Sequence, residues 1–174
     1  PSNYLVASTG VLEDDNEKKR LISYADSCAQ LFNNSAILNY ATPASRPDYK
    51  KIKFTAMKVV DFAWFADKRF LVHHSDMSIN NKNIDLWAFF YPEDRMIWSQ
   101  ATLYMARAVR YFNDLVGPYP YPQVTTVECK RAGSDAMEYP MITLIDQYYG
   151  QPSELEKVIV HEVGHNWFQS ILAT

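Results

Sequence analysis

Cysteine is scarce in this sequence: the 174 residues include two, Cys28 and Cys129, which lie far apart. A small secreted scaffold held together by disulfides needs more cysteines for its size, so that class of protein is excluded. We expect two reduced, partly buried thiols, and a single long-range disulfide is the alternative. The cysteines therefore leave the cellular compartment open.

The sequence also lacks a large excess of charge of one sign and lacks long apolar runs. The 17 basic and 20 acidic residues give a net charge of −3 and form no long run of one sign, which argues against a nucleic-acid partner. The longest wholly apolar stretch, Leu86–Tyr91, is too short to span a bilayer. The chain opens at Pro1 without a basic and apolar leader, which suggests a mature product or an excised piece.

Apolar residues, by contrast, are plentiful, since 48% of the sequence is hydrophobic and 14% is aromatic. This composition is enough to build a core, so disorder, collagen and a coiled coil are excluded. The length suits one domain or parts of two.

Hydrophobic periodicity predicts a mixture of helices and strands. The expected helices cover residues 21–32, 97–115 and 153–172, and the expected strands cover 4–11, 51–56, 84–90, 124–129 and 137–145. Residues 62–74 are expected to form a hairpin with its turn at Asp67–Lys68. Because Pro140 cannot donate to a ladder, its strand should lie at a sheet edge. The polar cluster Ser75–Asn83 is the best candidate for a domain boundary.

The last predicted helix carries a constellation that points to metal chemistry. It opens with a capping-box pattern, Ser153 to Glu156. His161 and His165 lie one turn apart on one face, so both imidazoles can reach a single metal ion. Glu162 points about 100° away from His161. Its carboxylate can take a proton from metal-bound water and pass it to the leaving amine. This is the H-E-x-x-H arrangement of zinc peptidases.

Two buried histidines satisfied by hydrogen bonds are the alternative to a metal site. That alternative is less favoured, because two histidines and a glutamate inside an apolar helix are costly unless something pairs them. Gly164 lowers the helix propensity between the two histidines, which suggests that a neighbouring element passes close to that turn.

The sequence resembles the gluzincin zinc aminopeptidases, the family of aminopeptidase N and its relatives, and is most similar to a bacterial branch. The likeness is carried by HEVGHNWF (161–168), AMEYP (136–140), GPYPYP (117–122) and DFAW (61–64). Met137 and Glu138 match the Met-Glu pair of the family's glycine-x-Met-Glu-Asn strand. Asp135 stands where the family has its glycine, and Tyr139 where it has asparagine.

The resemblance implies an α+β fold with a mixed sheet and long helices. Residues 1–80 would be the C-terminal part of an N-terminal β domain, and residues 81–174 the truncated N-terminal part of a thermolysin-like zinc peptidase domain. The implied activity is that of a zinc aminopeptidase, which hydrolyses N-terminal peptide bonds with a zinc-activated water.

The resemblance also implies roles for individual residues. His161 and His165 would bind the zinc cofactor, and Glu162 would be the general base. Glu138, with Met137 and Ala136, would bind a peptide substrate through its free N-terminal amine. A carboxylate on an edge strand suits that role, because the strand's backbone can pair with the peptide.

A second metal site at His73-His74 with Asp76 is not expected. Adjacent residues of a strand face opposite sides, so the two rings cannot easily share one ion.

A catalytic zinc usually has three protein ligands. In the family the third is a glutamate on a following helix, and no acidic residue follows His165. We therefore expect the third ligand beyond this chain, weak or absent zinc binding, and no peptidase activity from the chain alone. Surface exposed by such a cut would favour self-association. A non-catalytic peptide-binding or scaffold relative of the family is the alternative function.

Overall fold

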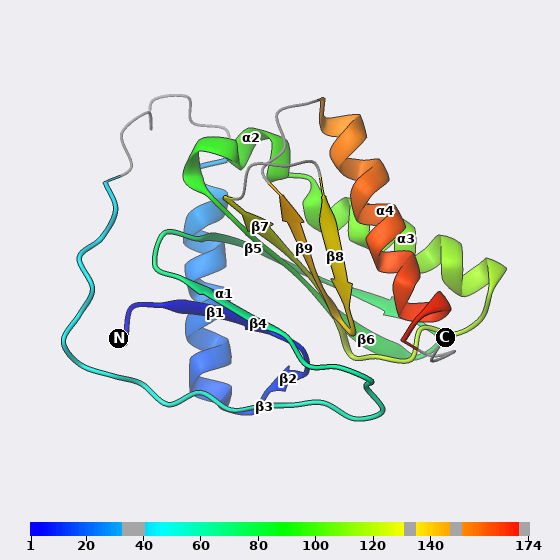
Figure 1. Ribbon diagram of the computed structural model, residues 1–174, viewed down its shortest axis with the longest axis horizontal. Helices are drawn as coiled ribbons and strands as arrows, with labels where there is room; N and C mark the ends of the chain where they lie inside the picture. Colours follow the sequence, from blue (N-terminus) through cyan, green and yellow to red (C-terminus); the bar gives the residue numbers. More distant parts are fainter. Residues whose placement is uncertain (33–40, 131–134, 147–150, 171–174) are drawn as a thin grey trace.

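A five-stranded sheet lies at the centre of the structure (Figure 1). The computed structural model describes residues 1–32, 41–130, 135–146 and 151–170. The strands, in their order across the sheet, are β5 (Leu71–Ile79), β6 (Lys82–Phe90), β7 (Gln123–Cys129), β9 (Ile142–Asp146) and β8 (Ala136–Tyr139). The middle strands β6, β7 and β9 run parallel, and the edge strands β5 and β8 are antiparallel to their neighbours. The predicted α+β fold with a mixed sheet and long helices is confirmed.

Helices and short strands cover the two faces of this sheet. One face packs against α3 (Ala101–Leu115) and α4 (Pro152–Phe168), which lie side by side (Figure 1). The short helices η1 (Pro92–Asp94) and α2 (Arg95–Trp98) lead into α3. The other face is covered by α1 (Asp15–Ala29) and by the pair β1 (Leu5–Ser8) and β4 (Trp64–Asp67). A second short pair joins β2 (Val11–Leu12) to β3 (Phe54–Thr55).

Strand alternation divides the core between these two faces. On β6, Ile84, Leu86 and Ala88 pack with α3 and α4, whereas Trp87 and Phe89 pack with the layer of α1 and β1. Both faces of the sheet are therefore apolar, as expected for strands that are covered on both sides. Within the described residues, no helix combines the length and apolarity needed to cross a bilayer.

The ends of α1 and α4 follow from local hydrogen bonds. Asp14 caps α1, because its carboxylate accepts from the amides of Asn16 and Glu17 at 2.9 and 3.1 Å. The capping box predicted at Ser153–Glu156 is wrong by two residues: Gln151 is the N-cap of α4, and its amide donates to Glu154 at 3.4 Å. Pro152 sets this start, because its fixed φ suits the first helical position.

Three strand predictions are corrected by the pairing. Residues 137–145 form two strands, β8 and β9, joined by a turn at Pro140–Met141, and β8 does lie at a sheet edge as predicted. Residues 62–74 form no hairpin, because β4 pairs with β1 and β5 pairs with β6. The predicted strand 51–56 is reduced to the two residues of β3.

The polar cluster Ser75–Asn83 belongs to the β5–β6 hairpin. Its turn is Asn80–Asn81, and both residues have positive φ, 51° and 59°. This is the backbone of a type I′ turn, the connection that best matches strand twist. The strands before and after residue 80 therefore share one sheet, and the division of the chain into parts of two domains stays a prediction.

Cys28 and Cys129 are both free thiols, as predicted. Cys28 lies on the buried face of α1, and burial raises the pKa of its thiol.

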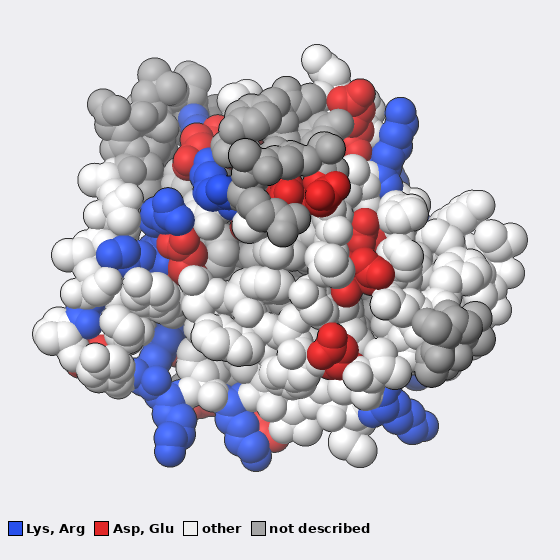
Figure 2. Space-filling view, viewed as in Figure 1, with Lys and Arg blue, Asp and Glu red and all other residues white. Residues whose placement is uncertain are grey.

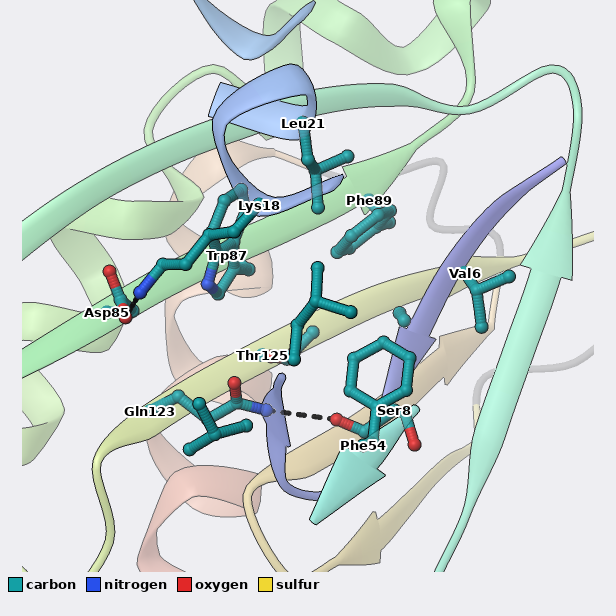
Figure 3. A pocket seen from close by; sticks show the side chains of 13 residues that line it. Val6, Ser8, Lys18, Leu21, Phe54, Asp85, Trp87, Phe89, Gln123 and Thr125 are labelled. Atoms are coloured by element: carbon teal, nitrogen blue, oxygen red, sulfur yellow. Dashed lines mark hydrogen bonds and ion pairs between the residues drawn. The ribbon is translucent and has the colours of Figure 1, made fainter. Parts of the chain in front are cut away.

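A small cavity separates the N-terminal strands from the sheet (Figure 3). Its volume is about 30 Å³, which is room for a water molecule or two. An ion pair of 2.6 Å between Lys18 and Asp85 lies at its rim, and Gln123 donates to the Ser8 carbonyl at 2.9 Å beside it. The cavity is therefore too small for a peptide.

Candidate metal centre

The position of α4 depends on close packing against α3. A Cβ atom placed on Gly164 would lie 2.8 Å from Cζ of Phe112, a ring on α3. The close neighbour expected from the sequence is therefore this aromatic ring. Leu155, Ile159, Val163 and Trp167 form the buried stripe of α4. The indole of Trp167 also donates to the Gly117 carbonyl at 2.8 Å. These contacts fix the rotation of α4 and so fix the direction of the side chains on its other face.

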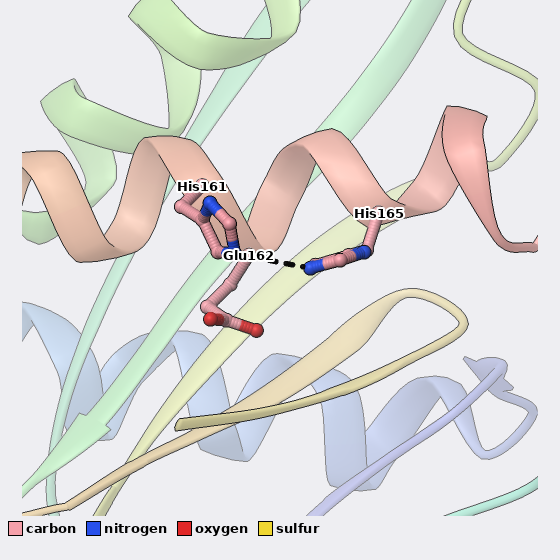
Figure 4. A group of neighbouring side chains, drawn as sticks. All are labelled: His161, Glu162 and His165. Carbon is pink, nitrogen blue, oxygen red and sulfur yellow. Dashed lines mark hydrogen bonds between the residues drawn. The ribbon is translucent and has the colours of Figure 1, made fainter. Parts of the chain in front are cut away.

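His161 and His165 lie side by side on that other face (Figure 4). Their Nε2 atoms are 3.2 Å apart, with the rings nearly perpendicular. His161 is exposed and His165 is half-buried. Figure 4 shows Glu162 on the same side of the helix, extending toward the sheet below. Potential ligand atoms of all three residues lie within 4.8 Å of one another.

This donor set fits a zinc ion. Two nitrogens that each bind tetrahedral zinc at 2.0–2.1 Å lie about 3.3 Å apart, close to the 3.2 Å between the imidazoles. Oε2 of Glu162 is buried without a hydrogen-bond partner among the described residues, and such an atom is costly unless a further group approaches it. Within the described ranges, these three residues are the group of His, Cys, Asp or Glu that could hold a metal ion.

Glu162 occupies the most enclosed position of the three, with 6% of its surface exposed. Burial raises the pKa of its carboxyl above the usual range, the two imidazoles lower it in part, and the charge of Glu138 raises it again. Glu162 and Glu138 therefore lie close enough to sense one another, although the sequence separates them by more than twenty residues.

Glu138 faces α4 because of its place on β8. It pairs with Thr143 on β9, and Thr143 pairs with Thr126 on β7. Ala136, two residues before Glu138 on the same side of the strand, packs in the core under α4. A row of polar residues thus crosses three strands beneath α4. The Thr143 side chain also lies close enough to Glu162 to lower the pKa of its carboxyl.

The predicted substrate-binding residues do not all face the same way. Glu138 and Ala136 lie on the α4 side, whereas Met137 alternates to the other side and is 46% exposed. Its carbonyl accepts from the Thr143 hydroxyl at 3.1 Å. Tyr139, which replaces the family's asparagine, also lies on the far side, with its ring 6.1 Å from that of Phe65.

The surface over this region is acidic. Figure 2 shows acidic side chains over α4 and β8, whereas lysines and arginines gather toward the N-terminal part of the same view. An acidic surface favours a metal ion or an ammonium group over an anion.

Two residues of the site were missed from the sequence. Thr143 lies between Glu138 and Glu162, and Asn166 accepts from the Met141 amide at 2.9 Å. The sequence signal for Asn166 was a polar residue within the apolar second half of the helix.

His73 and His74 face opposite sides of β5, as predicted. His74 donates to or accepts from Asp85 at 3.0 Å and lies on Trp87, with the ring centres 4.0 Å apart. His73 lies edge-on to Phe32 and 3.4 Å from the Thr102 hydroxyl. Burial lowers the pKa of His73, and the neighbouring His74 lowers it further.

Comparison with known proteins gives structural likeness without sequence likeness. No protein-family model matches the chain, and no curated protein matches it significantly. Solved structures do match: an M1 zinc metallopeptidase from Deinococcus radiodurans has a TM-score of 0.58 at 16% identity. A mutant of the M1 enzyme from the same organism has a TM-score of 0.59 at 15% identity. A mutant two-domain M1 zinc metallopeptidase bound to L-arginine has a TM-score of 0.58 at 15% identity.

These matches show a shared fold. Each covers 98% of this chain. The chain spans about a third of the length of the matched structures, 32% or 33%.

Proposed function

We propose that this chain carries two metal ligands and the general base of a zinc aminopeptidase. The observation that supports this most directly is the pair of imidazole Nε2 atoms 3.2 Å apart, with the buried carboxylate of Glu162 beside them. The fold shared with M1 zinc metallopeptidases adds weight to the same proposal.

His161 and His165 would hold the metal through their Nε2 atoms. When bound, a zinc ion would supply Lewis acidity toward the scissile carbonyl and toward water. Glu162 would act as the base and then as the acid: its Oε2, without another partner among the described residues, would hold a proton and pass it to the leaving amine. The enclosed position of Glu162 would keep bulk water from competing for that proton.

Glu138 would select substrates with a free N-terminus. Its carboxylate faces the same side of β8 as the histidines' helix, where it can pair with an ammonium group. The outer edge of β8 has no strand beside it among the described residues, so the backbone around Ala136 could pair with the peptide. Met137 would contribute through its backbone, because its side chain faces away.

The peptidase domain itself is part of the proposal. We assign residues 81–174 to a thermolysin-like domain and residues 1–80 to the end of a β domain, as the resemblance implies. The third zinc ligand would come from a further segment of a longer protein. The activity of such a protein and its peptide substrate are likewise proposed. One matched structure holds L-arginine, a free amino acid, which makes compounds with a free α-amine the first substrates to test.

Metal titration of the 174-residue chain tests the ligand assignment. Cobalt(II) and zinc should bind weakly, through His161 and His165, and each histidine-to-alanine variant should abolish binding. Glu162→Gln should bind metal as the wild type does, because Glu162 is assigned as a base and not as a ligand. Tight, sub-micromolar stoichiometric zinc would contradict the incomplete ligand set, and binding that survives both histidine variants would contradict the site.

Hydrolysis of aminoacyl p-nitroanilides tests the reaction. We expect no turnover from the chain alone, and turnover that Glu162→Gln abolishes in any longer natural protein that contains it. A longer protein that binds metal and peptide without hydrolysis would favour the scaffold alternative.

A further inference from the structure

The turn between β8 and β9 has an unusual backbone. Tyr139 pairs with Ile142, so Pro140 and Met141 form the whole connection. Met141 has a φ of 66°, in the left-handed region. Proline followed by a residue with positive φ fits a type II turn, which favours glycine or asparagine at the second position. Methionine is disfavoured there, because its Cβ crowds the next carbonyl.

Hydrogen bonds from three separate elements hold this turn. Oδ1 of Asn166, on α4, accepts from the Met141 amide at 2.9 Å. The amide of Thr125, on β7, donates to the Met141 carbonyl at 2.8 Å. The hydroxyl of Thr9, in the N-terminal segment, donates to the Pro140 carbonyl at 3.0 Å. A strained conformation persists only where its surroundings fix it, and these bonds do so.

Asn166 is the member of this set that belongs to the metal-binding helix. It directly follows His165, and it is 4% exposed. Its Nδ2 donates to the Val163 carbonyl at 3.0 Å, which aims Oδ1 at Met141. The same turn of α4 thus presents His165 on one side and fixes the β8–β9 turn on another.

We propose that Asn166 is a positioning residue that sets the place of Glu138 relative to His161 and His165. Glu138 lies two residues before the turn, on a strand of four residues. Without the Asn166 acceptor, Met141 can relax toward negative φ, and β8 shifts with it. The ligand class affected is compounds with a free α-amine. This inference rests on the proposed function, in which Glu138 binds that amine.

The test measures ligand selectivity and local exchange in the 174-residue chain. Leucine amide carries a free ammonium group, and N-acetyl-leucine amide lacks it. NMR titration gives the affinity for each, and hydrogen exchange of the Met141 amide reports the bond to Asn166. We expect the wild type to prefer leucine amide at least tenfold. Asn166→Ala should lose most of that preference and exchange the Met141 amide at least tenfold faster.

Two further variants separate positioning from stability. Adding Met141→Gly to Asn166→Ala should restore the selectivity, because glycine adopts positive φ without help. Tyr24→Phe removes a comparable side-chain hydrogen bond on α1, away from the site, in which the Tyr24 hydroxyl donates to the Phe70 carbonyl at 2.9 Å. It should lower the melting temperature and leave selectivity unchanged.

The outcomes that contradict the proposal are distinct. The proposal would be overturned if Asn166→Ala kept the wild-type selectivity and exchange. It would also be overturned if Tyr24→Phe lost as much selectivity, or if adding Met141→Gly to Asn166→Ala failed to restore it. A wild-type chain that binds both ligands equally would instead contradict the amine-binding role of Glu138, and with it this use of Asn166.

Discussion

Two of the glutamates that the structure describes are buried, in opposite settings. Glu162, on α4, is 6% exposed and lies beside two imidazoles near the surface. Glu128, on β7, is 1% exposed; its Oε2 accepts from the Tyr91 amide at 2.6 Å, and the carboxyl of Asp94 lies near enough to raise its pKa.

The two settings have different effects on the protonation of the two carboxyl groups. Burial and the neighbouring Asp94 raise the pKa of Glu128 to about 9, so at neutral pH its carboxyl is protonated and can donate to Asp94. Two imidazoles lie beside Glu162 instead, and they lower the pKa of its carboxyl in part. Burial alone therefore does not identify a catalytic carboxylate. The neighbouring groups distinguish the two glutamates. Asp94 helps to keep Glu128 protonated, which is a structural role, whereas the two imidazoles beside Glu162 place it in the candidate site.

The largest expected effect comes from Glu128→Gln. Between the usual pKa of 4.5 and about 9, the folded chain keeps a proton that the unfolded chain has lost. Stability therefore falls as pH rises through this window, by roughly 3–6 kcal/mol in all. Glutamine can accept the hydrogen bond from the Tyr91 amide without a charge, so the variant should lack that fall and be more stable than the wild type near pH 8. Urea unfolding at a series of pH values measures the difference.

Glu156→Gln is the control for this comparison. Glu156 forms an ion pair with Arg107 at the surface, 2.8 Å long, and exposed pairs contribute little. The plot of its unfolding free energy against pH should run parallel to that of the wild type. If the Glu128→Gln curve were also parallel, Glu128 would not hold a proton in the folded state.

A smaller effect is expected from Glu162→Gln. The amide replaces a buried carboxylate whose Oε2 has no partner among the described residues, so the metal-free variant should gain about 1 kcal/mol at neutral pH. Denaturant unfolding without metal measures the change. A gain as large as that of Glu128→Gln, or a loss of more than about 2 kcal/mol, would remove the distinction between the two glutamates.

The smallest effect is expected from His161→Ala. His161 is exposed, so the metal-free stability should stay within about 0.5 kcal/mol of the wild type. Added zinc should raise the melting temperature of the wild type by mass action and leave the variant unchanged. Strong destabilisation without metal would mean that His161 has a packing role, and the contrast with buried Glu128 would weaken.

Elements with a regular local pattern were predictable from the sequence. The buried stripe of α4 and the spacing of His161 and His165 follow from helical periodicity, and β6 and β7 follow from their apolar residues. The pairing of β4 with β1 was not predictable, because nothing in either strand records its partner.

The missed turns have different causes. Asn80–Asn81 is a good type I′ sequence, but the polar residues around it on edge strand β5 resemble a linker. At Pro140–Met141 the proline suits the first central position of a type II turn, but the second position holds methionine in place of the usual glycine or asparagine. Asn166 was missed because its role depends on a contact 25 residues away in the chain. Glu128 was missed because a single acid in a strand looks the same exposed or buried.

The hydrogen bond between Thr9 and Pro140 joins segments 131 residues apart. Closing so long a loop is entropically costly and comes late when a chain folds. The hydrogen bonds within α4, which set the one-turn spacing of the two histidines, are local and can form early. The β8–β9 turn acquires its last anchor only when the first strands dock, so the two proposed metal ligands can reach their one-turn spacing before the strand that is proposed to select the substrate is fixed.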